Sequence, residues 1–495
     1  MKQFGKIFIK AMAFVMVLTG TILSLNQILT PKYFYNNTWP TTSTYLGFYK
    51  MEKNTVDVLF FGSSHAASSF SPQILYDRYG ITSYNLGCEQ QNLITSYFWL
   101  KEALRFQKPK AVVLDCYILF PYNKEEALNA AESCTRKAMD YMRWSPVKWE
   151  AVHAICAADE KQSLSSYYLP NIRFHTRWTG LNEEDFTFSE MSSHYELKGF
   201  TALPKFSENH DYRPFSAEES SEEEPMVELM EEYLDKITEL CSQQGISLLL
   251  VKTPSTSENS QKYNRLQRYA QDHGLQFLDF NEKQIYQKIG YEFATDNADG
   301  GHGSVWGAAR ITSYIGNVLR HQYGLAEKTD PQWEKTKEYY KGVVKDCSLK
   351  MITDIGTYLD LIKDNRYLVM IAIRDEGVEA LNEDLLGKLK NLGLKAELEG
   401  EYRCSYYGIV ADGVVKECLG YEMLETMGSI RNNRSFYEIS SAGYESGNAC
   451  SIRIDGKEYA KNMRGMNIVV YNPITKAVVD SVCFDTHEKG AKAQR

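Results

Sequence analysis

The distribution of apolar residues divides the chain into a long N-terminal region and a shorter C-terminal region with a different pattern. Between about residues 57 and 322, short apolar runs of strand length alternate with segments whose apolar residues recur at helical spacing. The runs lie at 57–61, 83–86, 111–114 and 277–280, and the helical segments lie at 71–79, 93–106, 225–244, 263–273 and 304–319. This alternation predicts a parallel sheet covered by helices on both faces.

The second pattern follows a charged segment, 328–345, which predicts a linker helix. Apolar runs of strand length lie at 368–373, 406–410, 451–454, 466–471 and 478–484, with a helical segment at 382–392. Gly456, Gly465 and Asn472-Pro473 punctuate these runs as hairpin turns do. The region therefore predicts a separate α+β or β-sandwich domain.

The N-terminus carries a third pattern, in which Lys2, Lys6 and Lys10 precede an apolar run from Ala11 that extends to Leu29. A basic flank before such a run fits either a cleaved signal peptide or an uncleaved signal anchor. Residues 25–30 lack the small-x-small pattern of a cleavage site, which favours the anchor. Because basic flanks stay in the cytoplasm, we expect a single-pass protein of the cell membrane, extracytoplasmic after about residue 30.

Composition narrows the function only slightly. The chain has 495 residues, 43% of them hydrophobic, which indicates two or three folded domains. A net charge of −9 without a long basic run argues against nucleic-acid binding. The ten cysteines show no Cys-x-x-Cys spacing, which argues against a zinc site. Disulfides, which suit an exported protein, and free buried thiols both fit their scattered positions.

The candidate chemistry begins at Ser64, in the turn Gly62-Ser63-Ser64-His65 just past the first strand. In open α/β sheets, ligands bind at this end of the strands. A base is found far downstream, in the glycine-rich segment Asp299-Gly300-Gly301-His302. Asp and His three residues apart can contact each other, so the carboxylate orients the imidazole while the other ring nitrogen faces a serine. The sequence therefore predicts a catalytic triad of Ser64, His302 and Asp299.

Two neighbouring residues compete for these roles. Asp296 is an alternative partner for His302, but its separation of six residues in the chain favours Asp299. His65 directly follows the predicted nucleophile and is expected to point away from the position of the base. We therefore assign His65 a structural or substrate-facing role.

The motifs resemble those of the SGNH (GDSL-type) hydrolases over about residues 55–322. Gly62-Ser63-Ser64-His65 is similar to their first block, Tyr84-Asn85-Leu86-Gly87 to their second, and Asp299-x-x-His302 to their closing block, while 247–254 resembles their late core strand. The resemblance implies a three-layer α/β/α flavodoxin-like domain with Ser64 as nucleophile. It also implies that the backbone amides of Ser64 and Gly87 bind the oxyanion.

One block of that family is missing. The third block, Gly-x-Asn-Asp, contributes an asparagine to the oxyanion hole, and the strand 111–115 ends without it. Asn92 and Asn123 are weak candidates to replace that asparagine. Because an oxyanion donor contributes about 3 kcal/mol, its loss predicts a slower or more specialised enzyme.

The most similar branch is the membrane-anchored group that includes the D-alanyl-lipoteichoic acid biosynthesis and alginate O-acetylation proteins. The resemblance implies a serine esterase or O-acyltransferase that acts on ester groups of a cell-wall or surface polysaccharide, with no cofactor and no metal. A teichoic-acid-like polymer and a membrane-bound acyltransferase are the partners it implies. The alternative is a non-catalytic glycan-binding scaffold within a cell-envelope assembly.

Residues 122–215 interrupt the α/β pattern and are rich in large aromatic side chains, including Trp144, Trp149 and Trp178. The part at 124–156 predicts a helical cover over the catalytic face. Two interpretations of the aromatic residues compete. They fill the core of the insertion, or they bind a sugar or polymer beside a catalytic cleft.

The C-terminal region also resembles a known family. Residues 367–376, 389–393 and 464–471 are similar to the interleukin-like EMT inducer (GG) domain, whose members are associated with glycan enzymes and carbohydrate binding. The expected organisation is a cytoplasmic tip and anchor (1–30), an SGNH-like domain (31–325), a linker (326–346), the GG-like domain (347–487) and a tail (488–495).

Overall fold

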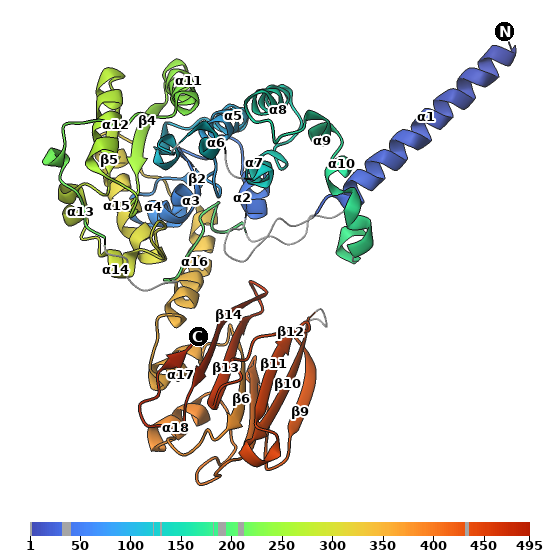
Figure 1. Cartoon of the computed structure of the whole chain (residues 1–495), viewed down its shortest axis with the longest axis vertical. Coiled ribbons are helices and arrows are strands. Elements are labelled where there is room, and N and C mark those ends of the chain that lie inside the picture. The colour runs from blue at the N-terminus through green and yellow to red at the C-terminus, as the bar shows by residue number, and fades with distance from the viewer. Residues whose placement is uncertain are drawn as a thin grey trace. The chain divides into compact units, whose positions relative to one another are not determined.

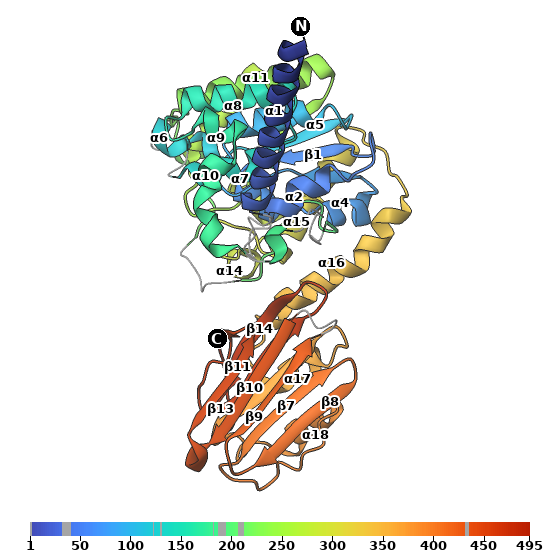
Figure 2. The ribbon, with the colours of Figure 1, turned by 90° about the vertical axis from the view of Figure 1, so that its right-hand side faces the viewer.

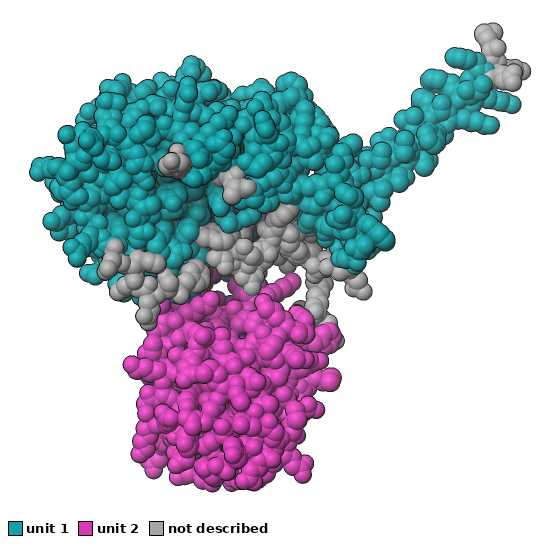
Figure 3. Space-filling model, viewed as in Figure 1, with its two compact units in different colours: residues 1–340 teal, residues 341–495 magenta. Residues whose placement is uncertain are grey.

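The computed structural model describes residues 2–31, 41–121, 123–128, 131–181, 183–186, 195–205, 212–430 and 435–495. They form two compact units, residues 1–340 and 341–495, which Figure 3 colours separately. Each unit has its own sheet and its own hydrophobic core. The two are therefore described one after the other, with the elements labelled as in Figure 1.

Unit 1 is built on five parallel strands in the order β2-β1-β3-β4-β5. Their bounds are β1 (Val58–Phe61), β2 (Ser83–Asn85), β3 (Ala111–Asp115), β4 (Ser247–Lys252) and β5 (Gln276–Asp279). From β1 the chain moves first to one side of the sheet and then to the other. The point at which the strand order reverses lies between β1 and β3, where doubly wound sheets bind their ligands.

Helices cover both faces of this sheet, as the sequence predicts. The helices of unit 1 are α1 (Lys2–Leu29), α2 (Thr41–Phe48), α3 (Ser64–Ser69), α4 (Pro72–Tyr79), α5 (Leu93–Ala103), α6 (Lys124–Ala127), α7 (Glu132–Met139), α8 (Pro146–Ala158), α9 (Leu164–Tyr168), α10 (Asn171–Phe174), α11 (Glu228–Gln244), α12 (Ser260–Asp272), α13 (Lys283–Lys288), α14 (Phe293–Asp296) and α15 (Val305–His321). Short 3-10 turns are η1 (Tyr117–Leu119), η2 (His175–Gly180), η3 (Glu183–Phe186) and η4 (Ala217–Glu219).

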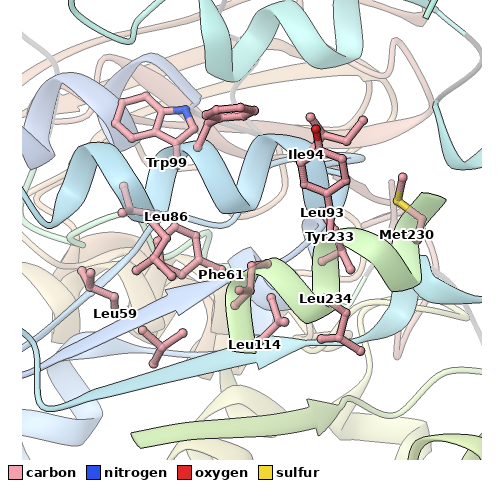
Figure 4. Packing of buried hydrophobic residues seen from close by; sticks show 14 of the residues in the cluster. Leu59, Phe61, Leu86, Leu93, Ile94, Trp99, Leu114, Met230, Tyr233 and Leu234 are labelled. Carbon is pink, nitrogen blue, oxygen red and sulfur yellow. The ribbon is translucent and has the colours of Figure 1, made fainter. Parts of the chain in front are cut away.

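Strand β1 is wholly apolar, and β3 and β4 are apolar between their ends, because both faces of the sheet are buried. Successive side chains point to opposite faces, so Leu59 and Phe61 join one core while Val58 and Phe60 join the other. Figure 4 shows the first core, where side chains of β1 and β3 lie beneath α5 and α11. The second core is closed by α4 and α15.

Helix α1 contains a stretch, Phe4–Leu29, of 26 residues that is long and apolar enough to cross a membrane. Most of its large apolar side chains are exposed, and Figure 1 shows the helix projecting from the rest of unit 1. This finding is consistent with a single-pass membrane anchor or with a signal sequence.

The predicted start of one helix of unit 1 is wrong. Helix α11 begins at Glu228 rather than at Pro225, because the preceding residues are extended and Val227 donates its N–H to the carbonyl oxygen of Leu119 at 3.1 Å. The helical cover predicted at 124–156 is three helices, α6, α7 and α8, and Pro146 begins the last of them.

Helix α16 (Pro331–Leu349) begins in unit 1 and ends in unit 2. Unit 2 combines one curled sheet with the helices α17 (Ile355–Ile362) and α18 (Glu383–Asn391). Its strands are β6 (Leu368–Asp375), β7 (Ser405–Ala411), β8 (Val414–Gly420), β9 (Leu424–Ile430), β10 (Ser435–Gly443), β11 (Ala449–Ile454), β12 (Lys457–Glu458), β13 (Gly465–Asn472), β14 (Ala477–Phe484) and β15 (Ala493–Gln494), with the 3-10 turn η5 (Tyr444–Ser446). All neighbouring strands are antiparallel except β6 and β10. The two helices α17 and α18 pack on one face, and the curled sheet encloses a second core on the other.

The turn prediction for Gly465 is wrong, because this residue begins β13 with a φ of 104°. The hairpin after Asn472 is present as predicted, between β13 and β14. All ten cysteines are free thiols.

Candidate active site

The turn that carries Ser64 depends on the glycine that precedes it. Strand β1 ends at Phe61, and Gly62 adopts a φ of 136°, in the region that favours glycine. A Cβ atom at Gly62 would lie 2.7 Å from the Cβ of Asp115, so a larger residue would clash with β3. Ser63 then caps α3 and accepts the N–H of His65 at 3.3 Å. Ser64 is thereby placed as the first residue of α3, at the carboxyl edge of the sheet.

The structure brings the three predicted triad residues together. The Ser64 hydroxyl lies 2.8 Å from Nε2 of His302, although 238 residues separate the two in the chain. Nδ1 of His302 lies 2.9 Å from Oδ2 and 3.0 Å from Oδ1 of Asp299. The serine, imidazole and carboxylate form one continuous chain of hydrogen bonds.

Asp299 is held by its own loop. The backbone N–H groups of Gly301 and His302 donate to its Oδ1 at 2.8 and 2.9 Å. Burial favours the neutral acid, but the hydrogen bonds from His302 and the Gly301 amide outweigh it and hold the pKa of Asp299 well below its usual range. An ionised Asp299 keeps the proton on Nδ1 of His302 and leaves the Nε2 lone pair facing Ser64.

Any function of this chain has to be inferred from the triad itself. The chain matches no known protein family and no curated protein. Within the described ranges, no group of three or more His, Cys, Asp or Glu side chains is arranged to hold a metal ion.

Asp296 does not compete for His302. Its Oδ2 accepts Nε of Arg310 at 2.7 Å and the N–H of Glu292 at 2.8 Å. The orienting carboxylate in this structure is therefore that of Asp299.

Helix α15 holds the loop of the base against the helix of the nucleophile. The Thr312 hydroxyl donates to the carbonyl oxygen of Ser69 at 3.1 Å and accepts the N–H of Ser71 at 2.9 Å. Helix α15 also packs directly on α3 and α4. The short distance between Ser64 and His302 thus depends on the docking of one helix on two others.

The expected oxyanion donors differ in their availability. Ser64 is the first residue of α3, a position at which the N–H has no acceptor within the helix. The N–H of Gly87 instead donates to Oδ1 of Asn85 at 2.9 Å. Asn85 in turn donates to the carbonyl oxygens of Ala66 and Phe70, at 2.8 and 2.9 Å. In this structure Gly87 is therefore part of the support of α3.

The two asparagines considered as a third donor both lie at the start of a helix. Asn92 caps α5 and accepts the N–H of Thr95 at 3.0 Å. Asn123 caps α6 and accepts the N–H of Glu126 at 2.9 Å. Both side chains serve as helix caps.

The expectation that His65 points away from the base is wrong. Its ring centroid lies 5.0 Å from that of His302, and the ring stacks on Tyr117 at 3.7 Å. Nδ1 of His65 lies 3.3 Å from the Thr253 hydroxyl. Burial lowers the pKa of His65 well below its usual value, and the nearby His302 adds to the effect, so the ring is neutral. Its adjacency to Ser64 was the only signal of this position in the sequence.

A buried charge cluster that the sequence analysis missed lies at the ends of three neighbouring strands. Asp115 ends β3, Lys252 ends β4 and Asp279 ends β5, and Glu258 follows β4 in the chain. Lys252 and Glu258 form an ion pair in which each side chain is 1% exposed. Burial raises the pKa of Asp115 and of Asp279 to about 7. A charged residue at the end of each of three apolar runs was the available signal.

Removal of the single cation of this cluster is expected to be costly. We expect Lys252→Met to lower the free energy of unfolding by about 3 to 5 kcal/mol, because it leaves buried carboxylates without a counter-charge. Denaturant unfolding measures this change. The control is Lys236→Met, which breaks the exposed pair with Glu232 and should cost about 0.5 kcal/mol or less. Equal losses in the two variants would contradict the role given to Lys252.

The raised pKa of Asp115 predicts a pH-dependent effect of its substitution. The pKa is about 7 in the folded protein and about 4 in the unfolded chain, so the stability due to the bound proton is complete below about pH 4 and lost as the pH rises through about 7. Asp115→Asn removes the carboxyl group that titrates, so the variant does not undergo this loss of stability. We expect the stability of the variant relative to wild type to increase from about pH 5 to about pH 8 in thermal unfolding. A constant difference across that window would show that Asp115 titrates at its ordinary pKa in the folded protein.

Proposed function

We propose that unit 1 is an SGNH-type serine esterase or O-acyltransferase. The observation that carries this proposal is the hydrogen-bonded chain from Ser64 through His302 to Asp299. Its position at the carboxyl edge of a parallel sheet, beside the reversal of strand order, is where such a fold binds ligands. A serine with an oriented base in that position is equipped for acyl transfer.

The proposed reaction uses the same triad in its two halves, acylation and deacylation of Ser64. His302 Nε2 takes the proton of Ser64 as its Oγ attacks the ester carbonyl carbon, and Asp299 stabilises the resulting imidazolium. His302 then gives the proton to the departing alcohol, and the acyl group stays on Ser64. Water or a polymer hydroxyl attacks this acyl-enzyme and loses its proton to His302. Release of the acid or the new ester returns the proton to Ser64.

The oxyanion donors limit the expected rate. The Ser64 amide is one donor, and Gly87 becomes a second only if its N–H leaves Oδ1 of Asn85. A missing donor lowers kcat by about 10² to 10³. The same observation favours the alternative proposal, a non-catalytic glycan-binding scaffold within a cell-envelope assembly.

We propose a cell-wall or surface polysaccharide as the substrate, with α1 as the anchor that keeps the catalytic unit outside the cell membrane. Unit 2 is proposed as a GG-like carbohydrate-binding module. It has a mainly apolar cavity of about 360 Å³ whose lining includes Tyr367, Tyr437, Lys416 and Asp412. Tyrosine side chains with a few polar groups suit the faces and hydroxyls of a sugar ring.

Covalent trapping tests the proposal. The full-length chain is treated with a fluorophosphonate, digested, and its peptides are mapped by mass spectrometry. A single adduct on Ser64 supports the proposal that the chain is an enzyme. A second assay, incubation of the chain with an acetyl ester in the presence and absence of a polysaccharide acceptor, separates transfer from hydrolysis. A folded protein that carries no adduct supports the scaffold.

A further inference from the structure

The insertion between β3 and β4 exposes an unusual set of large apolar side chains. Six of them form what we call the aromatic surface: Trp144, Trp149, Tyr168, Ile172, Trp178 and Phe186. Their exposed fractions run from 41% for Tyr168 to 70% for Trp178. Tyr167 and Phe174 of the same insertion are buried, so its core is already filled by other aromatic residues. The exposure of these six side chains contradicts the interpretation that they fill the core of the insertion.

These residues follow one another through neighbouring elements. Trp144 stacks on Tyr168 with ring centroids 5.2 Å apart and nearly parallel planes. Helices α8, α9 and α10 contact each other in turn, and α10 contacts η2, which carries Trp178. Phe186 ends η3. The exposed side chains therefore belong to a continuous group of elements.

Three of these elements, α10, η2 and η3, pack against the C-terminal end of α1. Figures 1 and 2 show α10 beside the base of α1. The N–H of Asn171 donates to Oδ1 of Asn26 at 3.0 Å, and Arg177 donates to the carbonyl oxygen of Leu29 at 2.6 Å. Arg177 is itself fixed by Asp185 at 2.7 Å.

The position of these contacts along α1 indicates their depth in a membrane. The apolar run from Ala11 to Leu29 would span about 28 Å as a helix, close to the roughly 30 Å of a hydrocarbon core. Elements packed on Asn26 and Leu29 then lie at the level of the lipid headgroups. Tryptophan and tyrosine are enriched at that level, because their rings prefer apolar surroundings while their N–H and O–H groups need water.

We propose that the aromatic surface rests in the headgroup region of the same membrane that α1 enters, as a second lipid contact of unit 1. This contact holds the catalytic unit against the bilayer in one orientation. The inference does not depend on the proposed chemistry, since none of the six residues belongs to the triad.

Quenching of tryptophan fluorescence by brominated lipids tests the inference. The full chain is reconstituted in vesicles of phosphatidylcholine and phosphatidylglycerol that carry bromine either near the headgroup end of the acyl chains or near their middle. Every protein also carries Trp39→Phe, which removes the tryptophan nearest to α1 in the chain. The test variant combines Trp144→Phe, Trp149→Phe and Trp178→Phe. The control combines Trp306→Phe and Trp333→Phe, which lie outside the insertion.

We expect the parent protein to be quenched more strongly by the shallow bromine than by the deep one. In the test variant the intensity lost to quenching should fall to less than about a third of the parent value. In the control variant this quenched intensity should equal that of the parent. Equal quenching in the two variants, or none in the parent, would overturn the proposal. The parent protein would show no quenching if the aromatic surface bound a protein partner instead of lipid, or if the chain did not insert into the vesicles.

Discussion

Replacement of Ser64 by alanine is expected to abolish ester hydrolysis and fluorophosphonate labelling, with kcat/KM falling by about 10⁴-fold or more. The reason is that the Ser64 hydroxyl is the group held 2.8 Å from Nε2 of His302, so it is the one that this base can activate. Hydrolysis of a small aryl acetate by the full-length chain measures the change.

Ser63→Ala is the matched control, because Ser63 precedes the nucleophile in the same turn. Its side chain caps α3 and lies 3.5 Å from Asp115, so its loss should reduce stability by about 1 kcal/mol without removing the nucleophile. We expect this variant to keep its activity within about tenfold of wild type. Activity that survives in Ser64→Ala, or disappears equally in both variants, would show that another group carries the reaction.

Asp299→Asn is expected to lower kcat/KM by about 10³ to 10⁴ while leaving the fold intact. Oδ1 of Asp299 accepts the N–H groups of Gly301 and His302, so the oxygen of an asparagine would stay there. Its amino group would then face Nδ1 of His302, where Oδ2 now lies at 2.9 Å. The imidazole would have to carry its proton on Nε2, the nitrogen that must accept the proton of Ser64.

Asp296→Asn provides the comparison for this variant. Asp296 bonds Arg310 rather than His302, so we expect its substitution to affect melting temperature more than kcat/KM. Steady-state kinetics and thermal unfolding on both variants make the test. A larger loss of kcat/KM in Asp296→Asn than in Asp299→Asn would show that Asp296, and not Asp299, orients His302.

The parallel sheet and the positions of the triad residues were predictable because both follow from local pattern. Strands β1, β3 and β4 of unit 1 are buried on two faces and therefore appear as short apolar runs. Asp299 and His302 are close in the chain, so their contact needs no knowledge of the rest of the fold. In unit 2, β8, β9 and β10 mix polar and apolar residues on their exposed face, including the exposed Val414, Met427 and Phe436, and this is why the apolar pattern missed them.

Other features depend on contacts between distant segments. The charge cluster exists because strand register sets Asp115 beside Val251 and Lys252 beside Asp279. The position of His65 depends on Tyr117, from the turn after β3, and on Thr253, from the end of β4. The hydrogen bond between Gly87 and Asn85 is local, but whether that N–H faces a neighbour or the site depends on the backbone of the loop, which apolar periodicity does not report.

The 238 residues between Ser64 and His302 also order events during synthesis of the chain. The nucleophile leaves the ribosome long before its base, and α15 must fold onto α3 and α4 before the two can meet. Until then the Ser64 hydroxyl is an ordinary alcohol, and a nascent or truncated chain that ends before α15 has no means to activate it. The proposed reactivity would therefore require the completion of unit 1, and an unfinished chain would have an unactivated serine.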